Sequence, residues 1–495
     1  MDPKVIRKLL VPNRGEIAIR VARTCRELGV VSVWAHSEGD AYCFPRHFFD
    51  ETTSLGEGDA RDTYLNVSKI VDAAKRSGVD AIHPGYGFLS ERAELAGACE
   101  AAGIRFIGPV ASSIELMGSK AAARARMERV GVPVVPGYHG DDQSDATLAT
   151  RAKEIGLPLL VKASAGGGGK GMKIVRDDAG LAPALESARR EAMKAFGNDG
   201  LLLERYIEES RHVEFQIFGD GKGNALHIFE RDCSIQRRHQ KIIEETPAPH
   251  YSADLRQRMA RSAIDAARAV DYRSAGTVEF LVTPKGDYYF LEMNTRLQVE
   301  HPVTEMVLGV DLVRGQIELA SSETLPWKQE DLRPRGHAIE CRVYAENPDE
   351  GFLPQTGTIA AYREPAGPGI RVDSGVTAGS EITVQYDPLL SKVIAFAETR
   401  ASAIDRLDRA LAEYLILGTT TNVSYLRRVI GHPEFRAGHL STLFVGRHED
   451  SLRRDLPAEA VSIAAVLSTA RRPERPAERS AAIPDIWDSL GKWDR

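Results

Sequence analysis

The chain has 495 residues, about three times the ~150 residues that serve as a rough prior for one domain, so we expect several domains. Asp and Glu (70) outnumber Lys and Arg (64), and the net charge of −6 argues against polyanion binding as the main role. Hydrophobic residues make up 43% of the chain, which excludes a disordered or fibrous protein.

Residues 1–118 alternate short apolar runs with helical patterns. Apolar runs predict strands at residues 9–11, 30–34, 81–82 and 106–107, and periodic apolar residues predict helices at residues 17–28, 70–74 and 94–102. Strands that alternate with helices form a parallel sheet covered on both faces, with ligands at the carboxyl ends of the strands. We therefore predict an α/β domain with a doubly wound parallel sheet.

From about residue 119 the pattern changes to β-hairpins mixed with helices, which predicts an α+β domain that continues to residue 334. Three pairs of strands are expected, at residues 158–162 with 172–175, 213–218 with 225–229, and 277–282 with 288–291. Residues 335–447 are rich in strands. Residues 448–495 are rich in Arg, Glu, Ala and Pro, and we expect a flexible tail there.

The connection between the first pair of strands contains four consecutive glycines, Gly166, Gly167, Gly168 and Gly169. A strand follows them rather than a helix, which argues against a dinucleotide fingerprint, and the GK[ST] ending of a P-loop is absent. Backbone amides without a Cβ beside them can lie over triphosphate oxygens. We predict a phosphate-covering hairpin loop, and a mobile surface loop is the alternative.

The third pair of strands brings two carboxylates together. With the turn centred on residues 285–286, antiparallel register sets Glu279 opposite Glu292, and Asn294 shares the face of Glu292. Two facing carboxylates repel unless a hard cation such as Mg²⁺ lies between them. The sequence therefore predicts a metal site. In the alternative register, shifted by one residue, each glutamate points to solvent.

Two polar stretches accompany this pair of strands. In residues 294–302, Arg296 and Gln298 are suited to hold a small planar oxyanion, and Glu300 to remove its proton, although an ordinary charged loop has the same composition. Residues 230–241 suggest the wall of a site or, alternatively, a solvated basic face. We expect Cys233 in that stretch to be a structural thiol rather than a nucleophile.

Taken together, these segments resemble biotin carboxylase, the ATP-grasp component of biotin-dependent carboxylases. The similar motifs are found at residues 13–18, 83–91, 162–164, 230–234, 292–294 and 386–387, within a match that spans residues 5–447. The resemblance implies an N-terminal pre-ATP-grasp domain, an ATP-grasp domain with a mobile glycine-rich lid, a strand-rich C-terminal biotin carboxylase domain and a tail, at residues 1–118, 119–334 (lid about 135–205), 335–447 and 448–495.

The resemblance also implies roles for individual residues. ATP would be contacted by Lys120, Lys162, Met172, Glu204, Ile207, His212, Gln236 and His239, under a lid that includes Gly166 to Gly169. Mg²⁺ or Mn²⁺ would be held by Glu279 and Glu292, with Asn294 nearby. Bicarbonate would be bound by Lys241, Arg296, Gln298 and the amide of Val299. Glu300 would deprotonate the bicarbonate, Arg342 would stabilise the biotin enolate, and Tyr86 would lie near the biotin ring.

The implied reaction is ATP- and bicarbonate-dependent carboxylation of biotin N1′ through carboxyphosphate, feeding a carboxyltransferase of the acyl-CoA or pyruvate type. The implied partners are a biotin carrier on a separate chain and a carboxyltransferase subunit, in a homodimer or a larger hetero-oligomer. Residues 483–493 resemble the start of the domain that joins longer acyl-CoA carboxylase subunits to their complex, so we expect the tail to dock onto a partner. Two alternatives stay open: another ATP-grasp ligase that forms a carboxylate–amine bond, and a non-catalytic scaffold subunit.

The sequence also gives expectations about location. The five cysteines lie far apart with no CxxC pair, as expected for reduced thiols. No signal peptide precedes the first strand, and no apolar run approaches the ~20 residues of a membrane span. We expect a cytoplasmic protein that binds neither nucleic acid nor membrane.

Overall fold

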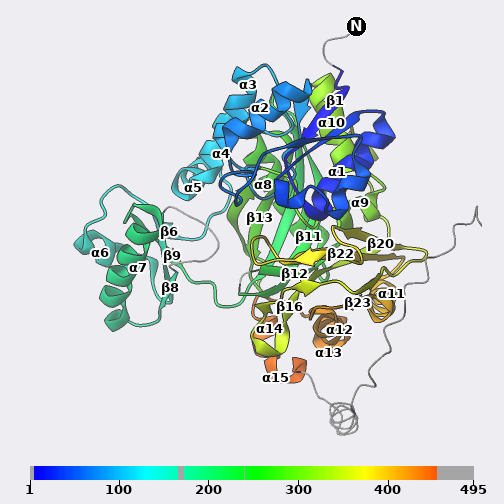
Figure 1. Cartoon of the computed structure of the whole chain (residues 1–495). Coiled ribbons are helices and arrows are strands. Elements are labelled where there is room, and N and C mark those ends of the chain that lie inside the picture. The colour runs from blue at the N-terminus through cyan, green and yellow to red at the C-terminus, as the bar shows by residue number, and fades with distance from the viewer. Residues whose placement is uncertain (1–4, 165–171, 239, 454–495) are drawn as a thin grey trace, which may run out of the picture. The chain divides into compact units, whose positions relative to one another are not determined.

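The computed structural model describes residues 5–164, 172–238 and 240–453 (Figure 1). Residues up to Leu452 belong to one compact unit. The predicted glycine loop (Gly166, Gly167, Gly168 and Gly169), His239 and almost all of the predicted tail lie outside the described residues. Within the described ranges, no helix combines the length and apolar composition that crossing a bilayer requires.

The N-terminal part is a five-stranded parallel sheet in the order β3-β2-β1-β4-β5. Its elements are β1 (Lys8–Val11), α1 (Gly15–Leu28), β2 (Val31–His36), the 3₁₀ turns Glu38–Asp40 and Phe44–Phe48, β3 (Glu51–Ser54), α2 (Val67–Ser77), β4 (Ala81–Ile82), α3 (Ala93–Ala101) and β5 (Arg105–Phe106). Leu9 and Val11 pack in one hydrophobic cluster with residues of α1, whereas Leu10 packs in another with α2 and α3. Alternate residues of β1 therefore face opposite helical layers, which confirms the doubly wound parallel sheet.

Residues 111–205 add helices and a separate small sheet. The elements are α4 (Ala111–Gly118), α5 (Lys120–Arg129), β6 (Gly137–Tyr138), α6 (Asp145–Ile155), β7 (Leu159–Ala163), β8 (Lys173–Val175), the 3₁₀ turn Asp178–Gly180, α7 (Leu181–Phe196) and β9 (Leu201–Arg205). The four strands are antiparallel in the order β6-β9-β7-β8. The pairing of β7 with β8 confirms the two strands expected on either side of the glycines.

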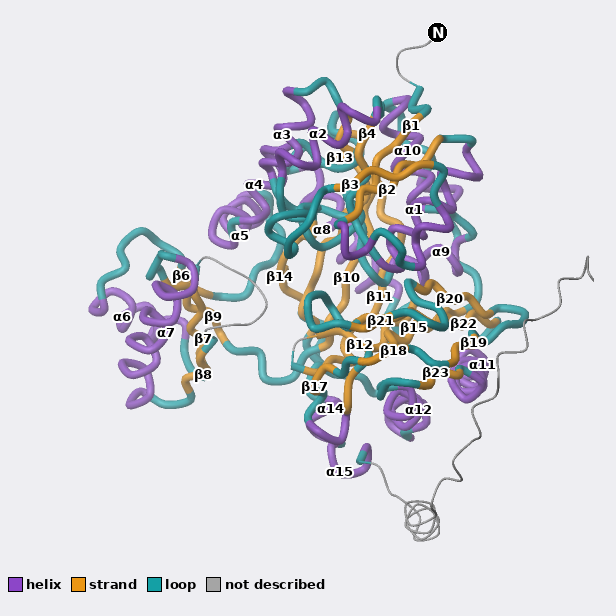
Figure 2. Tube along the Cα trace, in the orientation of Figure 1, coloured by secondary structure: helices purple, strands orange, loops and turns teal. Residues whose placement is uncertain are grey.

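An eight-stranded antiparallel sheet runs through the rest of the unit, in the order β14-β13-β10-β11-β12-β15-β22-β20 (Figure 2). Its strands are β10 (Arg211–Asp220), β11 (Ala225–Arg237), β12 (Gln240–Thr246), β13 (Arg273–Val282), β14 (Tyr288–Asn294), β15 (His337–Tyr344), β20 (Ile370–Ser374) and β22 (Leu389–Ala397). The pairs β10–β11 and β13–β14 confirm the other two expected strand pairs. Because β12 pairs with β15, the sheet is continuous across residue 334.

Helices and short strand pairs complete the unit. The helices are α8 (Ala253–Arg268), α9 (His301–Leu308), α10 (Leu312–Ser322), α11 (Arg400–Glu413), α12 (Val423–Gly431), α13 (Pro433–Ala437), α14 (Phe444–Arg447) and α15 (Glu449–Leu452), with 3₁₀ turns at Gln329–Asp331 and Pro348–Glu350. The short pairs are β16 (Glu346–Asn347) with β17 (Leu353–Pro354), β18 (Gly357–Thr358) with β21 (Glu381–Ile382), and β19 (Ala361–Arg363) with β23 (Leu415–Leu417).

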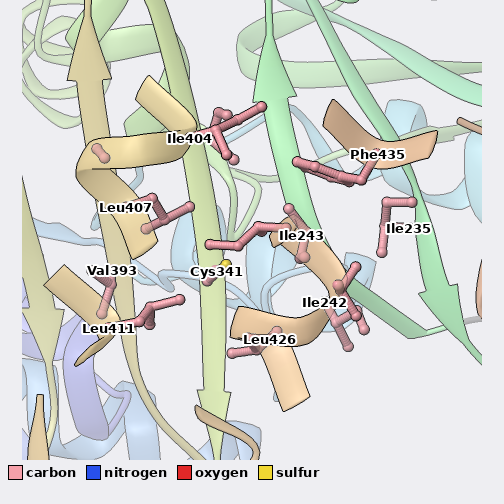
Figure 3. Packing of buried hydrophobic residues seen from close by; sticks show 14 of the residues in the cluster. Ile235, Ile242, Ile243, Cys341, Val393, Ile404, Leu407, Leu411, Leu426 and Phe435 are labelled. Carbon is pink, nitrogen blue, oxygen red and sulfur yellow. The ribbon is translucent and has the colours of Figure 1, made fainter. Parts of the chain in front are cut away.

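The core beneath this sheet is apolar and fixes the strands that lead into the site. Ile404 and Leu407 of α11 lie one helical turn apart and face Val393 of β22 and Cys341 of β15 (Figure 3). These side chains are at most 1% exposed. Cys341 is followed on β15 by Arg342, whose side chain points to the opposite face of the sheet. The apolar layer thus anchors one face of β15 while the other face is free for polar groups.

Candidate active site

The β13–β14 hairpin sets Glu279 opposite Glu292, as the sequence predicts, although the pairs nearer the turn, such as Phe280 with Phe290, are shifted by one residue and a register shift beside Glu279 restores the predicted pairing. Glu279 is paired with Glu292 across the two strands, and Asn294 lies opposite Thr277. The alternative register, with both glutamates in solvent, is wrong, because Glu279 is only 2% exposed. One face of this hairpin therefore presents two carboxylates and an amide at one place.

The carboxylate of Glu279 accepts four hydrogen bonds from side chains of the site. Its Oε2 accepts from Nε2 of His212 at 2.6 Å, and its Oε1 accepts from Nζ of Lys241 at 2.8 Å. The side-chain amides of Asn294 and Gln298 also donate to Oε1, at 2.8 and 3.0 Å. Burial alone would raise the pKa of Glu279, but Lys241 and His212 hold it well below its usual range. Glu279 is therefore ionised and fully partnered.

Glu292 has a different environment from its cross-strand neighbour. In the part of the chain that the structure describes, its carboxylate accepts no hydrogen bond and forms no ion pair, and the residue is exposed. Loss of hydration within the site and the charge of Glu279 both raise its pKa. A free carboxylate beside an ionised one has the donor chemistry that a divalent cation requires, so these residues fit Mg²⁺ or Mn²⁺. The oxygen of Asn294 accepts instead from Nη2 of Arg296 at 3.3 Å.

Two further groups of potential metal ligands lie beside the predicted metal site. Ligand atoms of His212, Glu214 and Glu279 all lie within 4.8 Å of one another, and so do those of Glu214, Cys233 and Glu300. Lys241 forms ion pairs with all three carboxylates of these sets, Glu214, Glu279 and Glu300, so a protein cation already offsets their charge. Glu292 belongs to neither set, and its carboxylate has no hydrogen-bond or ion-pair partner among the described residues.

Lys241 joins three buried carboxylates. Its Nζ lies 2.6 Å from Glu214 and 2.8 Å from both Glu279 and Glu300. These charges raise the pKa of Lys241 well above its usual value, although burial opposes the shift. The ammonium is thus permanently charged and connects the metal-side carboxylate Glu279 with Glu300.

Glu300 lies between two cations. It precedes α9, is fully buried, and accepts from Lys241 through Oε1 and from Nη2 of Arg342 through Oε2 at 3.0 Å. The pKa of Glu300 is well below its usual range because Lys241 and Arg342 outweigh the effect of burial. Arg342 is fixed from its other side by Glu244, whose Oε1 accepts from Nε at 2.6 Å. The predicted base and the predicted enolate-binding arginine are therefore in direct contact.

Arg296 links the loop after β14 to the N-terminal part. Its Nε donates to Oε2 of Glu91 at 2.9 Å, and its Nη1 donates to Oε1 of Gln298 at 2.7 Å. The alternative of an ordinary charged loop is wrong, because Gln298 and Glu300 are buried and share partners with the metal-side residues. The carbonyl of Val299, between them, accepts from Nζ of Lys392 at 2.7 Å.

The residues assigned to ATP lie in two groups. His212 contacts Gln236, with Nδ1 2.7 Å from Nε2, next to Glu279. Lys162 of β7 and Arg124 of α5 both donate to Glu204 of β9. The other assigned residues are Lys120, which begins α5 and whose pKa is lowered by burial, half-buried Met172 before β8, and half-buried Ile207 after β9. His239 and the glycine loop are outside the described residues.

The stretch 230–241 is largely buried rather than a solvated basic face. Strand β11 continues to Arg237, and Arg231 is fully buried with its Nε 2.5 Å from Oε1 of Glu214. Cys233 is also buried, and burial raises the pKa of its thiol well above the usual value, as expected for a structural cysteine. Tyr86, assigned to the biotin side, donates its hydroxyl to Oε1 of Glu16.

Sequence reasoning missed three charged residues that build the site: Glu214, Glu244 and Lys392. Each is fully buried on a strand. Lys392 is the one charged residue of β22, whose other residues are apolar apart from Ser391. A charged residue in such a strand is itself a signal, since a buried charge requires a partner.

Three family models match successive parts of the chain. "Biotin carboxylase, N-terminal domain" matches residues 5–114, "Carbamoyl-phosphate synthase L chain, ATP binding domain" residues 119–328, and "Biotin carboxylase C-terminal domain" residues 340–447. The chain is 47% identical to biotin carboxylase 1 of Bacillus subtilis over 446 residues, which is 90% of this chain and 99% of that protein.

Longer relatives and solved structures are similar as well. The alpha subunit of mitochondrial methylcrotonoyl-CoA carboxylase from Dictyostelium discoideum is 48% identical over 491 residues, 99% of this chain. The chain spans 61–70% of the length of six such subunits. The biotin carboxylase domain of 2-oxoglutarate carboxylase from Hydrogenobacter thermophilus, solved with MgADP, ADP and bicarbonate, has a TM-score of 0.87, 46% identity, and coverage of 91% of this chain and 100% of that one. A biotin carboxylase from Campylobacter jejuni also gives 0.87, with 42% identity and coverage of 90% and 100%.

Proposed function

The chain belongs to the biotin carboxylase family of ATP-grasp ligases, and from this we propose how its residues carry out the ATP- and bicarbonate-dependent carboxylation of biotin. The observation that carries the proposal is the continuous set of contacts from Glu279 through Lys241 and Glu300 to Arg342. These contacts join the metal-side carboxylate, the base and the biotin-side arginine. Biotin carboxylase families match both ends of the chain, which argues against another kind of ATP-grasp ligase.

We propose that bicarbonate binds between Arg296, Gln298 and the amide of Val299, with Glu300 as the proton acceptor. Bicarbonate is a poor electrophile, so it attacks the γ-phosphate of ATP and forms carboxyphosphate. A carboxylate with a low pKa is a weak base. We infer that the bicarbonate oxyanion draws Lys241 away from Glu300, which removes a neighbouring positive charge and raises the pKa of Glu300.

ATP would be held by the two groups of residues around His212 and Glu204. Lys120 and Lys162 would supply positive charge to the phosphates, and Glu279 and Glu292 would hold Mg²⁺ or Mn²⁺, with Asn294 nearby. When bound, the metal neutralises charge on the phosphate oxygens. The glycine loop Gly166–Gly169, Met172, Ile207, Gln236 and His239 complete this assignment. Water destroys carboxyphosphate, so closure over the nucleotide would be part of the reaction.

Biotin would approach Arg342 and Tyr86. Carboxyphosphate releases CO₂ and phosphate, the phosphate takes the N1′ proton of biotin, and the guanidinium of Arg342 stabilises the enolate that captures CO₂. Its fixed orientation against Glu244 and Glu300 means that the charge is in place before the enolate forms. This preorganisation lowers the barrier because no solvent rearranges during the step.

We further propose that the biotin is attached to a carrier protein or carrier domain and that the carboxyl group passes to a carboxyltransferase, within a homodimer or larger assembly. Several relatives are named as subunits of methylcrotonoyl-CoA or pyruvate carboxylases, which supports a carboxylase complex. A cytoplasmic location is proposed from the five free thiols, which suit a reducing compartment. Some relatives carry the word mitochondrial in their names.

One experiment tests the proposed function. Purified protein with MgATP is expected to release phosphate only when bicarbonate is present, and free biotin is expected to accelerate the release while N1′-carboxybiotin accumulates. Phosphate release is followed with a coupled assay, and carboxybiotin with ¹⁴C-bicarbonate. Equal ATP cleavage without bicarbonate would show that the function is wrong.

A further inference from the structure

A fully buried lysine connects the two substrate sides of the site. Lys392 lies on β22 and is 0% exposed, and its Nζ donates to the carbonyl of Val299 at 2.7 Å and lies 3.1 Å from Oε1 of Glu16. Asp373 lies farther away, at 3.8 Å. Lysine is almost never fully buried unless it is paired. Burying a charge costs free energy, so a lysine at this position indicates that its ammonium group has a role there.

Glu16, the partner of Lys392, is in contact with the biotin side. It lies in the first turn of α1, is 4% exposed, and accepts a hydrogen bond from the hydroxyl of Tyr86. Nζ of Lys392 also lies 6.0 Å from the centre of the Tyr86 ring. A continuous chain of contacts therefore runs from Tyr86 through Glu16 and Lys392 to the carbonyl of Val299.

The three parts of the chain that meet at Lys392 come from far apart in sequence. Glu16 belongs to helix α1 of the N-terminal part, Val299 to the loop after β14, and Lys392 to β22. The carbonyl of Val299 and the N–H of Glu300 belong to one planar peptide, so fixing this carbonyl fixes the peptide that leads into Glu300, next to Gln298. The anchor therefore acts on the segment that holds the oxyanion-binding groups and the base.

Lys392 is also the cross-strand neighbour of Arg342 on β15. Two cations on one face of adjacent strands repel each other unless each has its own partner. Arg342 is held by Glu244 and Glu300, and Lys392 by Glu16 and the Val299 carbonyl. The two cations thus have separate anchors, and Arg342 keeps its orientation towards Glu300.

We propose that Lys392 is a positioning residue that fixes the segment 298–300 relative to Tyr86. The groups that bind bicarbonate and those that bind biotin then stay at a fixed distance from each other. This inference rests on the proposed function. Carboxyphosphate formed on one side must deliver CO₂ to biotin on the other, and a variable spacing allows the intermediate to be lost to water. Loss of the anchor is therefore expected to separate ATP cleavage from biotin carboxylation.

The test uses a double variant, because removal of one partner from a buried pair leaves an uncompensated charge and can unfold the protein. Lys392→Met with Glu16→Gln removes both charges and keeps the volumes close. The matched control is Arg400→Met with Glu245→Gln, which removes another pair, 2.7 Å apart, in which the glutamate is 2% exposed. Both variants are first checked for folding by circular dichroism and for ATP affinity by calorimetry.

We expect the Lys392/Glu16 variant to cleave at least five times more ATP per biotin carboxylated than the unsubstituted protein, with a raised KM for bicarbonate. The control should keep the original ratio. Amide hydrogen exchange of residues 295–300 should accelerate at least tenfold in the Lys392/Glu16 variant, and this readout does not depend on activity. Unchanged exchange, or a folded variant with an unchanged ratio, would overturn the proposal. Absence of bicarbonate-dependent ATP cleavage in the unsubstituted protein would instead contradict the proposed function.

Discussion

Glu279 and Glu292 face each other across β13 and β14, yet among the described residues only Glu279 has hydrogen-bond partners in the protein. The carboxylate of Glu279 accepts four hydrogen bonds, whereas that of Glu292 accepts none in the described part of the chain. Protein donors therefore neutralise one member of the pair and leave the other for a ligand. Removing the charge of Glu292 should therefore stabilise the metal-free protein and weaken metal binding.

Glu292→Gln is expected to stabilise the protein without metal and to weaken its use of Mg²⁺. The substitution removes repulsion with Glu279, so the melting temperature measured in EDTA should rise. The Mg²⁺ concentration needed for half-maximal ATP cleavage should rise at least tenfold, about 1.4 kcal/mol, because a carboxylate donor is lost. Asp287→Asn, an exposed change in the turn of the same hairpin, is the control. A lower melting temperature in EDTA would contradict the assigned repulsion.

Glu300→Gln is expected to retain the fold and lose bicarbonate-dependent ATP cleavage. A positioned general base contributes roughly 10²–10⁴ in rate, so kcat should fall within that range. The amide can still accept from Lys241 or Arg342, which limits the loss of stability. Phosphate release is measured against bicarbonate concentration, with exposed Glu413→Gln as the control. Wild-type kcat in the folded variant would show that another group takes the proton.

Arg342→Ala is expected to abolish biotin carboxylation and to affect ATP cleavage less, since its guanidinium contacts the base but not the metal-side residues. The truncation leaves Glu244 and Glu300 without one cation and should destabilise the protein by roughly 3–5 kcal/mol. Arg342→Lys is therefore measured beside it, because a lysine keeps the charge and loses the fork geometry. Carboxybiotin formation at the original rate in either folded variant would mean that the role is misassigned.

Glu245 is expected to make stability depend on acid pH. It accepts from Nε2 of His337 at 2.6 Å and from Nε of Arg400 at 2.7 Å, and these partners lower its pKa to about 2 despite burial. Its contribution is present above the unfolded pKa near 4.5 and is lost as the pH falls towards 2. The shift corresponds to roughly 3 kcal/mol.

The measurement for Glu245 is urea unfolding between pH 7 and pH 3. The unsubstituted protein should lose part of its unfolding free energy as the pH falls below about 4.5. Glu245→Gln should be less stable at pH 7 and should lose less stability on acidification. A parallel decline of the two proteins over this pH range would refute the assigned contribution.

From the sequence, local structure could be predicted more completely than the contacts between the residues of the site. The parallel sheet at the N-terminus followed from alternation of strands and helices. The Glu279–Glu292 pair was also predicted, but the turn position alone does not produce it: Phe280 pairs with Phe290 in a register shifted by one residue, and an irregularity beside Glu279 restores the predicted pair. Such a register shift is not visible in the spacing of the sequence.

The partners of the site residues were not predictable in the same way. Lys241 contacts Glu214, and Arg342 contacts Glu244, through pairings between strands that the sequence does not place next to each other. The polar stretch around Arg231 has the composition of a solvated face and is nevertheless buried, because Arg231 pairs with Glu214 and Asp232 with Arg211, both on the neighbouring strand β10. Composition describes what a segment contains, whereas burial depends on the sheet order.

The pairing of β12 with β15 has a consequence for dividing the protein into parts. The register joins Thr246 to Ala338 and Ile243 to Cys341, so a cut at residue 334 would strip a central strand of its neighbour. An N-terminal fragment ending there would leave the backbone N–H and C=O groups along one edge of β12 unpaired, and such an edge is a template for aggregation. A chimera that takes its C-terminal part from a homologue should therefore keep the pairing of β12 with β15. Lys241 lies on β12 and Arg342 on β15, and both must donate to the carboxylate of Glu300.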